Sequence, residues 1–312
     1  MSSGSVGSNA ERAALALWAE AELGSALDRA LGDALRRTAQ RPSDGSGRVD
    51  VAAYDMALDC PARWSVREDD FAATARTTAG AVGRLALRDR REDEPVPLAV
   101  DRVLSDLEGV DPDVAWFASW YLYELDRAGR AAVRAAASTW AVSALMSVRG
   151  RRLTWVPRRQ PADVPGRMIR LRTNWDASTG GAHPEVLLVM TGRPLSDRVV
   201  PLMAGFNALA DSLLRHVVPL RVRVGSGAAG STVAFAVTEE LLQQVIDCVV
   251  ELVLWRVDPA AAPTNPGSWC RHCHLLDICP DASTEGAGGP AAAGRSQGAD
   301  GHSGGGGGDP TT

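Results

Sequence analysis

Three cysteines lie close together late in the chain, in a Cys-x2-Cys-x5-Cys array formed by Cys270, Cys273 and Cys279. A Cys-x2-Cys turn lets two thiolates reach one metal site from nearby backbone positions, and the third can follow after a short loop. A fourth ligand must come from elsewhere, and Cys60, which precedes Pro61, is the natural candidate. We therefore expect these four cysteines to bind one inorganic centre that ties the end of the folded chain to its beginning.

The residues alone leave the identity of this centre open. Zinc accepts mixed sets of cysteine and histidine, so His272 or His274 could replace Cys60 in a structural zinc site. A cubane iron–sulfur cluster is usually held by cysteines alone. The remaining cysteine, Cys248, lies in an apolar helical pattern, and we interpret it as a buried thiol of the hydrophobic core.

Composition limits the classes of protein to which the chain can belong. Its 312 residues are 45% hydrophobic, which permits one large domain or two small ones with a buried core. It shows neither a signal-peptide pattern nor the run of about 18 to 20 apolar residues that a membrane-spanning helix needs. We therefore expect a cytoplasmic protein without a membrane partner, whose cysteines are thiols or metal ligands rather than disulfides.

The periodicity of the apolar residues predicts an α/β (α+β) fold with an α-helical N-terminal half. Helices are expected at residues 11–39, with a break near Gly24, and at 51–58, 72–88, 98–107 and 114–148. Strands are expected at residues 152–156, 167–175, 185–190, 217–224 and 231–237, with further helices at 199–215 and 239–255. This pattern is typical of a small mixed sheet flanked by helices.

Three regions are expected along the chain. Residues 1–48 form an N-terminal helical segment and linker, and residues 49–280 form the main domain with its C-terminal cysteine cluster. Residues 281–312 are rich in Gly, Ala and Ser, and we expect them to be a disordered tail because such a composition cannot form a core.

A remote Cys-Pro pair followed by a C-terminal Cys-x2-Cys-x5-Cys array resembles the iron–sulfur branch of the RecB-like PD-(D/E)xK nuclease superfamily. That branch includes the AddB-type helicase–nuclease subunits and the CRISPR-adaptation exonucleases, and its order of elements is similar over roughly residues 51–280. The resemblance implies a restriction-endonuclease-like core and a [4Fe-4S] cluster on Cys60, Cys270, Cys273 and Cys279. It also implies a family activity, metal-dependent DNA cleavage.

The catalytic motifs of that family are altered in this chain. Gly83 stands where the resemblance expects a metal-binding histidine, and Arg170 stands where it expects an aspartate. Leu188 and Met190 take the places of the third motif's acid and lysine, and all 33 basic residues of the chain are arginine. Leucine and methionine cannot hold a hard Mg²⁺ or Mn²⁺ ion, and arginine would repel one. We therefore expect a catalytically degenerate member, a pseudoenzyme.

The alternative is an active DNA exonuclease with relocated metal ligands. Asp176, Glu185 and Asp197 lie near the altered motifs and could hold Mg²⁺ or Mn²⁺ in that case. Without the resemblance, these carboxylates are simply surface residues next to turns. The sequence therefore leaves open whether the protein is an enzyme.

Arginines are concentrated in the segment 149–172, which contains a single acid, Asp163; Trp155 lies within the segment and Trp175 lies just after it. The arginines are Arg149, Arg151, Arg152, Arg158, Arg159, Arg167, Arg170 and Arg172. Guanidinium groups contact phosphates in a bidentate manner and aromatic rings stack on unpaired bases, so the segment could bind single-stranded or duplex DNA. Alternatively, these arginines are only the solvent-facing residues of two strands.

These observations favour a DNA-binding or scaffolding subunit beside an active nuclease or helicase partner. The formal net charge of −5 argues against a protein surrounded by nucleic acid, but it permits a local basic stripe. A further alternative is a zinc-stapled protein-interaction module without any role in nucleic-acid binding.

Overall fold

The computed structural model describes most of the chain. The described residues are 8–38, 48–57, 60–65, 73–109, 117–148, 154–155, 161–173, 175–179, 184–190, 197–226, 232–267, 270, 273, 275, 277, 279 and 281. The chain forms two compact units, Met1–Thr264 and Asn265–Thr312. The helices and sheets belong to the first unit, and the Cys-x2-Cys-x5-Cys array belongs to the second.

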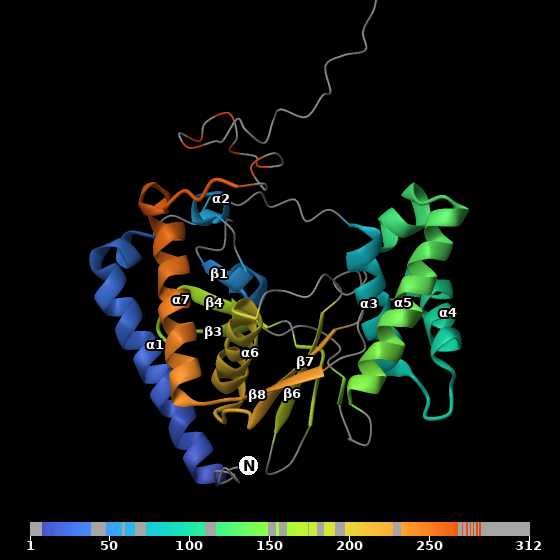
Figure 1. Cartoon of the computed structure of the whole chain (residues 1–312), viewed down its shortest axis with the longest axis horizontal. Coiled ribbons are helices and arrows are strands. Elements are labelled where there is room, and N and C mark those ends of the chain that lie inside the picture. Colours follow the sequence, from blue (N-terminus) through green and yellow to red (C-terminus); the bar gives the residue numbers. More distant parts are fainter. Residues whose placement is uncertain are drawn as a thin grey trace, which may run out of the picture. The chain divides into compact units, whose positions relative to one another are not determined.

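The larger sheet of the first unit has five strands in the order β2-β5-β6-β7-β8 (Figure 1). They are β2 (Thr154–Trp155), β5 (Ala177–Ser178), β6 (Glu185–Met190), β7 (Arg221–Ser226) and β8 (Thr232–Ala236). Neighbouring strands are antiparallel except β6 and β7, which are parallel. Because parallel neighbours need a crossover, helix α6 (Val199–Arg215) connects these two strands.

A second, three-stranded sheet has the order β1-β4-β3. Strand β1 (Val49–Ala52) runs parallel to β4 (Ile169–Arg172), and β3 (Pro161–Asp163) runs antiparallel to β4. Strand β4 therefore belongs to a different sheet from β6, although the two follow each other closely in sequence.

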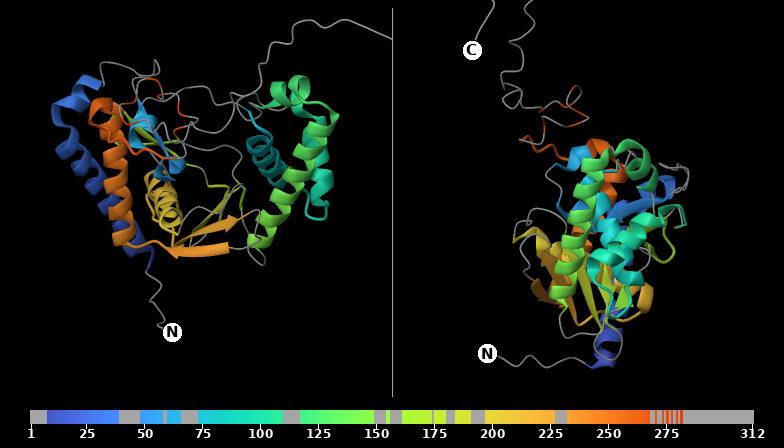
Figure 2. Two further views of the ribbon diagram at one scale, coloured as in Figure 1. Left: turned by 45° about the horizontal axis from the view of Figure 1, so that its top comes forward. Right: turned by 90° about the vertical axis from the view of Figure 1, so that its right-hand side faces the viewer.

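Helices cover both faces of the larger sheet. Val186 and Leu188 of β6 lie in a core with α1 (Asn9–Thr38), α6 and α7 (Glu239–Val257). Leu187 and Val189 lie in a second core with the three helices that Figure 2 shows together in green and cyan. These are α3 (Ala75–Asp89), α4 (Val96–Ser105) and α5 (Arg127–Ser147). The uninterrupted apolar run of β6 is the pattern required of a strand buried on both faces.

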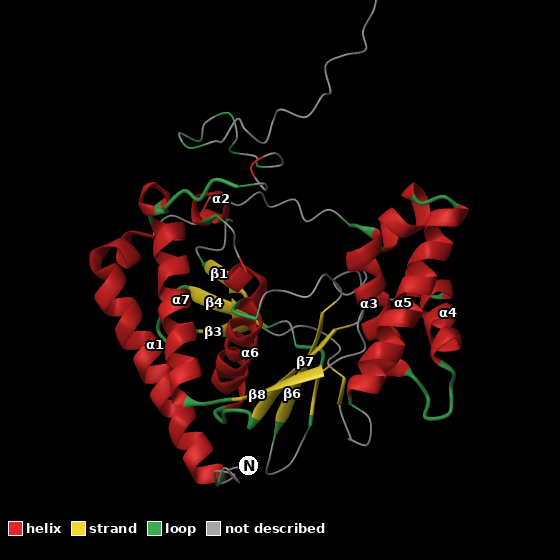
Figure 3. Ribbon diagram, viewed as in Figure 1, coloured by secondary structure: helices red, strands yellow, loops and turns green. Residues whose placement is uncertain are grey.

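Several short elements complete the first unit (Figure 3). They are η1 (Ala53–Ala57), α2 (Pro61–Ser65), η2 (Leu107–Gly109), the π-helical turn η3 (Trp120–Glu124) and η4 (Pro259–Ala261). No helix in the described ranges is both long enough and apolar enough to cross a membrane.

The structure confirms the mixed α/β fold and its helical N-terminal half. The helix predicted at residues 51–58 is wrong, because β1 occupies its first residues and pairs with β4, and only the turn η1 follows. The predicted break near Gly24 is also wrong: α1 continues through that residue and departs from helical geometry at Gly32, with φ 37° and ψ −119°.

Gly24 has a packing role instead of a helix-breaking one. The Nη2 atom of Arg167 donates to the Gly24 carbonyl oxygen at 2.9 Å, and a Cβ at residue 24 would lie 3.0 Å from that guanidinium group.

The helix predicted at residues 114–148 is divided into two elements, η3 and α5. Asp126 caps α5 by accepting a hydrogen bond from the Gly129 N–H at 2.7 Å. Apart from Asp281, the predicted tail lies outside the described residues.

Candidate functional site

The cysteine array begins with a tight turn in the second unit. The Cys273 N–H donates to the Cys270 carbonyl oxygen at 3.0 Å, which closes the Cys-x2-Cys segment into one turn. The Gly267 N–H donates to Cys270 Sγ at 3.3 Å, and the Cys270 N–H donates back to the Gly267 carbonyl oxygen at 3.0 Å. The Cys279 N–H donates to the Leu275 carbonyl oxygen at 2.8 Å.

Cys60 lies in the first unit, directly before α2, and is buried. The Ala62 N–H, two residues further on, donates to the Pro263 carbonyl oxygen at 3.2 Å. Pro263 precedes Cys270 by only seven residues. This hydrogen bond joins the start of α2 to the C-terminal end of the first unit.

Helix α2 is held against α7 by an aromatic contact. The Arg256 guanidinium lies 4.5 Å from the ring centroid of Trp64, which is buried. Arg256 Nη1 also donates to the Ser65 carbonyl oxygen at 3.5 Å. These contacts give the chain that follows Cys60 a fixed conformation within the first unit.

Among the residues that the structure describes, no three Cys, His, Asp or Glu side chains are grouped so that they could hold a metal ion. His272 and His274, the alternative zinc ligands, lie outside the described residues. Cys248 packs against the core of α1, α6 and α7, where burial raises the pKa of its thiol. Cys248 is only partly buried, so it borders the hydrophobic core rather than lying fully within it as predicted.

The structure gives a steric reason for Gly83, which stands where the RecB-like motif has a histidine. A Cβ at residue 83 would lie 2.4 Å from Cε3 of Trp140, because α3 and α5 pack closely at this point. A histidine side chain would require α5 to move. Leu188, at the position of the motif's acid, is buried in the core.

Arg170, which stands at the position of the motif's aspartate, lies in a different sheet from Leu188. Arg170 lies on β4, which pairs with β1 and β3, whereas β6 pairs with β5 and β7. The residue that directly precedes β5 is Asp176, and its N–H donates to the Leu187 carbonyl oxygen of β6 at 2.7 Å. Asp176 is therefore an acid that lies directly beside β6.

Both carboxylate oxygens of Asp176 accept hydrogen bonds. Arg84 Nη1 donates to Oδ1 at 3.1 Å, and the Val189 N–H donates to Oδ2 at 2.6 Å. The Asp176 side chain is fully buried, and the Arg84 guanidinium lies 5.5 Å from the Trp140 ring centroid. An arginine thus supplies a positive charge beside the acid that binds the β6 backbone.

The other two carboxylates considered as relocated ligands are placed differently. Glu185 is buried and accepts a hydrogen bond from Arg223 Nε at 2.8 Å. Asp197 is exposed in the turn before α6. Within the described ranges, Asp176, Glu185 and Asp197 are not grouped into a metal-binding set.

The predicted nucleic-acid-binding arginines are described only in part. Arg149, Arg151, Arg152, Arg158 and Arg159 lie outside the described residues. Arg170 Nε lies 3.5 Å from both Asp50 and Asp163, and Arg172 also forms an ion pair with Asp50. Arg170 and Arg172 therefore connect the strands of the smaller sheet, and a phosphate would compete with these carboxylates.

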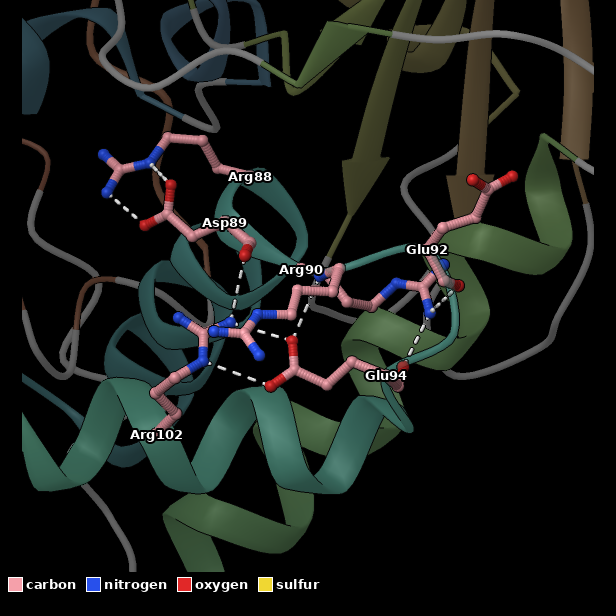
Figure 4. Close-up of polar contacts among 7 residues, drawn as sticks. Arg88, Asp89, Arg90, Glu92, Glu94 and Arg102 are labelled. Atoms are coloured by element: carbon pink, nitrogen blue, oxygen red, sulfur yellow. Dashed lines mark hydrogen bonds and ion pairs between the residues drawn. The ribbon is translucent and has the colours of Figure 1, made fainter.

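A second arginine-rich segment connects α3 to α4 (Figure 4). Arg102 Nη2 donates to Glu94 Oε2 at 2.9 Å and to the Asp89 carbonyl oxygen at 3.0 Å. The hydrogen bond from Arg102 lowers the pKa of Glu94. Arg90 Nη1 donates to the Glu94 carbonyl oxygen at 2.7 Å, and Arg88 pairs with Asp89. These arginines fix the turn rather than form a free cationic surface.

No protein-family model matches this chain. The curated proteins contain no match to it either. The likeness to RecB-like nucleases therefore depends on the cysteine spacing and the order of elements.

A buried ionisable cluster on α6 was not predicted from the sequence. The Asp211 side chain is fully buried, with Oδ1 at 2.9 Å from Arg215 Nε. Arg215 also donates to Ser178 Oγ at 3.1 Å and lies 5.0 Å from the ring centroid of Trp175. Burial raises the pKa of Asp211 to about 6, and the charge of Arg215 opposes this shift. The i, i+4 spacing of an acid and a base within an apolar helix was the available sequence signal.

Proposed function

We propose that this protein is a cluster-bearing, catalytically degenerate relative of the RecB-like nucleases. In this proposal it acts as a nucleic-acid-binding or scaffolding subunit beside an active nuclease or helicase. The observation that carries the proposal is the Cys270–Cys273 turn with the Gly267 N–H directed at Cys270 Sγ. Hydrogen bonds of this kind accompany thiolate ligands of iron–sulfur clusters and tune them.

The donor set of the chain fits a [4Fe-4S] cluster. Cys60, Cys270, Cys273 and Cys279 supply four thiols, which is the number that a cubane cluster takes. Cys60 is included because it is the fourth cysteine of the pattern on which the resemblance depends. When bound, the cluster would supply folding free energy by closing a loop of about 200 residues in the unfolded chain.

The contacts of the acids support the loss of catalysis. A hydrolytic site of this family needs carboxylates free to bind Mg²⁺ or Mn²⁺. Asp176 is bound by Arg84 and by the Val189 N–H, and Glu185 is bound by Arg223. The active-exonuclease alternative would require these ion pairs to open and the carboxylates to regroup.

The cluster is tested by an ultraviolet–visible spectrum and by iron, sulfide and zinc analysis of protein purified without oxygen. We expect broad brown absorption and about four irons per chain. Cys270→Ser should remove the colour and lower the melting temperature. Cys248→Ser, at a cysteine outside the proposed ligand set, should retain the colour. Colourless protein with one zinc would overturn the iron–sulfur proposal in favour of a zinc-stapled interaction module.

Nucleic-acid binding is tested with labelled single-stranded and duplex DNA. We expect affinity to fall steeply between 50 and 200 mM salt, because phosphate contacts release counterions. The double variant Arg158→Ala/Arg159→Ala should weaken binding to all sequences. The control Arg29→Ala, at an arginine of α1 that pairs with Glu22, should not. Binding without salt dependence would leave only the scaffolding role.

Catalytic degeneracy is tested by incubating single-stranded DNA with Mn²⁺ and the brown protein. We expect no cleavage above that of a Cys270→Ser control. Cleavage that disappears in Asp176→Asn would instead establish the active-exonuclease alternative and would contradict the degenerate assignment.

A further inference from the structure

Strand β8 forms one outer edge of the five-stranded sheet. It consists of Thr232, Val233, Ala234, Phe235 and Ala236. Val233 is 54% exposed, and Ala234 and Ala236 are exposed as well. Successive side chains of a strand point to opposite faces, so β8 is open to solvent on both faces of the sheet.

The other sheet edges in the described chain carry features that prevent edge-to-edge pairing. Strand β2 has only two residues. Strand β3 begins with Pro161 and ends with Asp163, and β1 contains Asp50, which pairs with Arg172. Short length, proline and charge are the usual protections of an edge strand. Strand β8 has five residues and contains neither proline nor a charged residue, so it has none of these three protections.

From this we propose that two copies of the chain associate through antiparallel pairing of their β8 strands, which joins the two sheets into one. A two-fold axis at Ala234 would place Val233 of one copy opposite Phe235 of the other, and the reverse. Pairs of an aromatic and a β-branched side chain are favourable neighbours across antiparallel strands. The sequence of β8 is therefore complementary to itself in this register.

The pairing would extend an existing core. Phe235 and Val233 lie opposite Val222 and Val224 of β7, and both of these valines belong to the core of α1, α6 and α7. Phe235 packs against that core, whereas Val233 remains largely exposed. A second β8 would place apolar side chains on the open side of Val233 and remove it from water.

The charges near β8 do not oppose a symmetric pair. Arg223 lies opposite Ala234 and is paired with Glu185 at 2.8 Å. In the paired sheet, the two copies of Arg223 would be separated by three strand spacings, about 14 Å. That distance exceeds the Debye length of about 8 Å at physiological salt. Arg221 lies opposite Ala236, which would face Thr232 of the second copy.

The test is the mass of the purified full-length protein in solution, measured by sedimentation equilibrium across a range of concentrations. We expect a concentration-dependent dimer. Val233→Lys and Val233→Glu should each be monomeric, because the substituted charges of the two copies lie close together across the axis. An equimolar mixture of the two variants should recover the dimer through opposite charges.

The matched control is Leu17→Lys, at an exposed leucine of α1 that is 63% exposed, and this variant should dimerise like the unmodified protein. Circular dichroism and thermal unfolding establish that each variant is folded. A monomer at every concentration, or dimers of Val233→Lys as strong as those of the unmodified protein, would overturn the proposal. These outcomes are independent of the proposed function, which the absorption spectrum and DNA binding test separately.

Discussion

The guanidinium of Arg84 binds the carboxylate of Asp176 at 3.1 Å and so fixes helix α3 to the start of strand β5. The carboxylate side chain is fully buried, whereas the arginine side chain is 22% exposed. A buried carboxylate without its cation is strongly unfavourable, because the charge has lost its hydration. The pair therefore couples the packing of α3 to that of β5.

We predict that Arg84→Met destabilises the protein by about 3 to 5 kcal/mol, since it removes the guanidinium group that binds the buried Asp176 carboxylate. The double variant Arg84→Met/Asp176→Leu should recover much of this loss because it removes both charges. Urea unfolding of the single and double variants measures the coupling between the two residues. As a control, Arg48→Met breaks an exposed pair with Asp163 and should cost no more than about 1 kcal/mol. Equal losses at the two sites would contradict the argument.

Elements with a long, uniform pattern could be predicted from the sequence. The bounds of β6 and α6 agree with the predicted ranges 185–190 and 199–215. Strand β6 is a continuous apolar run, and α6 keeps an amphipathic helical pattern over its whole length. Strand β5 has two residues, too few to establish a period, and was missed. Strand β1 was predicted as helix because its pairing with β4, at the register Val49–Ile169, is invisible to local periodicity.

The candidate site shows the same difference between local patterns, which the sequence reveals, and contacts between distant residues, which it does not. The cysteine array is a local pattern, so its members were found by spacing. The acid beside Arg172 was not found, because Asp50 lies 122 residues away in sequence and approaches only through sheet pairing. The sequence also did not predict which sheet contains Arg170, because β4 and β5 follow each other in the chain but belong to different sheets.

Asp211 should make stability depend on pH. Burial raises its folded-state pKa from 3.8 to about 6, so the folded protein holds a proton that the unfolded chain releases between these values. The resulting stability is present below about pH 4 and is lost as pH rises through 6, on the order of 3 kcal/mol. Asp211→Asn should lack this loss and be more stable than the unmodified protein above pH 6.

Urea unfolding at pH 4 to 8 measures this difference. The control Asp247→Asn replaces an exposed aspartate of α7 that accepts a hydrogen bond from Gln243, and it should retain the pH dependence of the unmodified protein. If Asp211→Asn and the unmodified protein showed parallel stability curves, the Asp211 carboxylate would not be the group responsible.

Gly83 should be intolerant of even one additional carbon atom. Gly83→Ala would place Cβ 2.4 Å from the Trp140 ring, so α3 and α5 must separate. We expect a loss of about 1 to 3 kcal/mol, as for other overpacked cores. In a Trp140→Ala background the same substitution should cost little, because the ring is gone. Thermal or urea unfolding of the four proteins measures this coupling, and an unchanged cost in both backgrounds would show that helix separation is not the cause.

The Gly267 N–H should tune the proposed cluster through its hydrogen bond to Cys270 Sγ at 3.3 Å. Reduction adds negative charge to the cluster, and an N–H directed at a ligand sulfur stabilises that charge. Gly267→Pro removes the N–H and should lower the reduction potential, whereas Gly267→Ala keeps the N–H and serves as the matched control. Potentials are measured by redox titration of the visible absorption. If the proline and alanine variants shifted the potential equally, backbone geometry rather than the hydrogen bond would be its source.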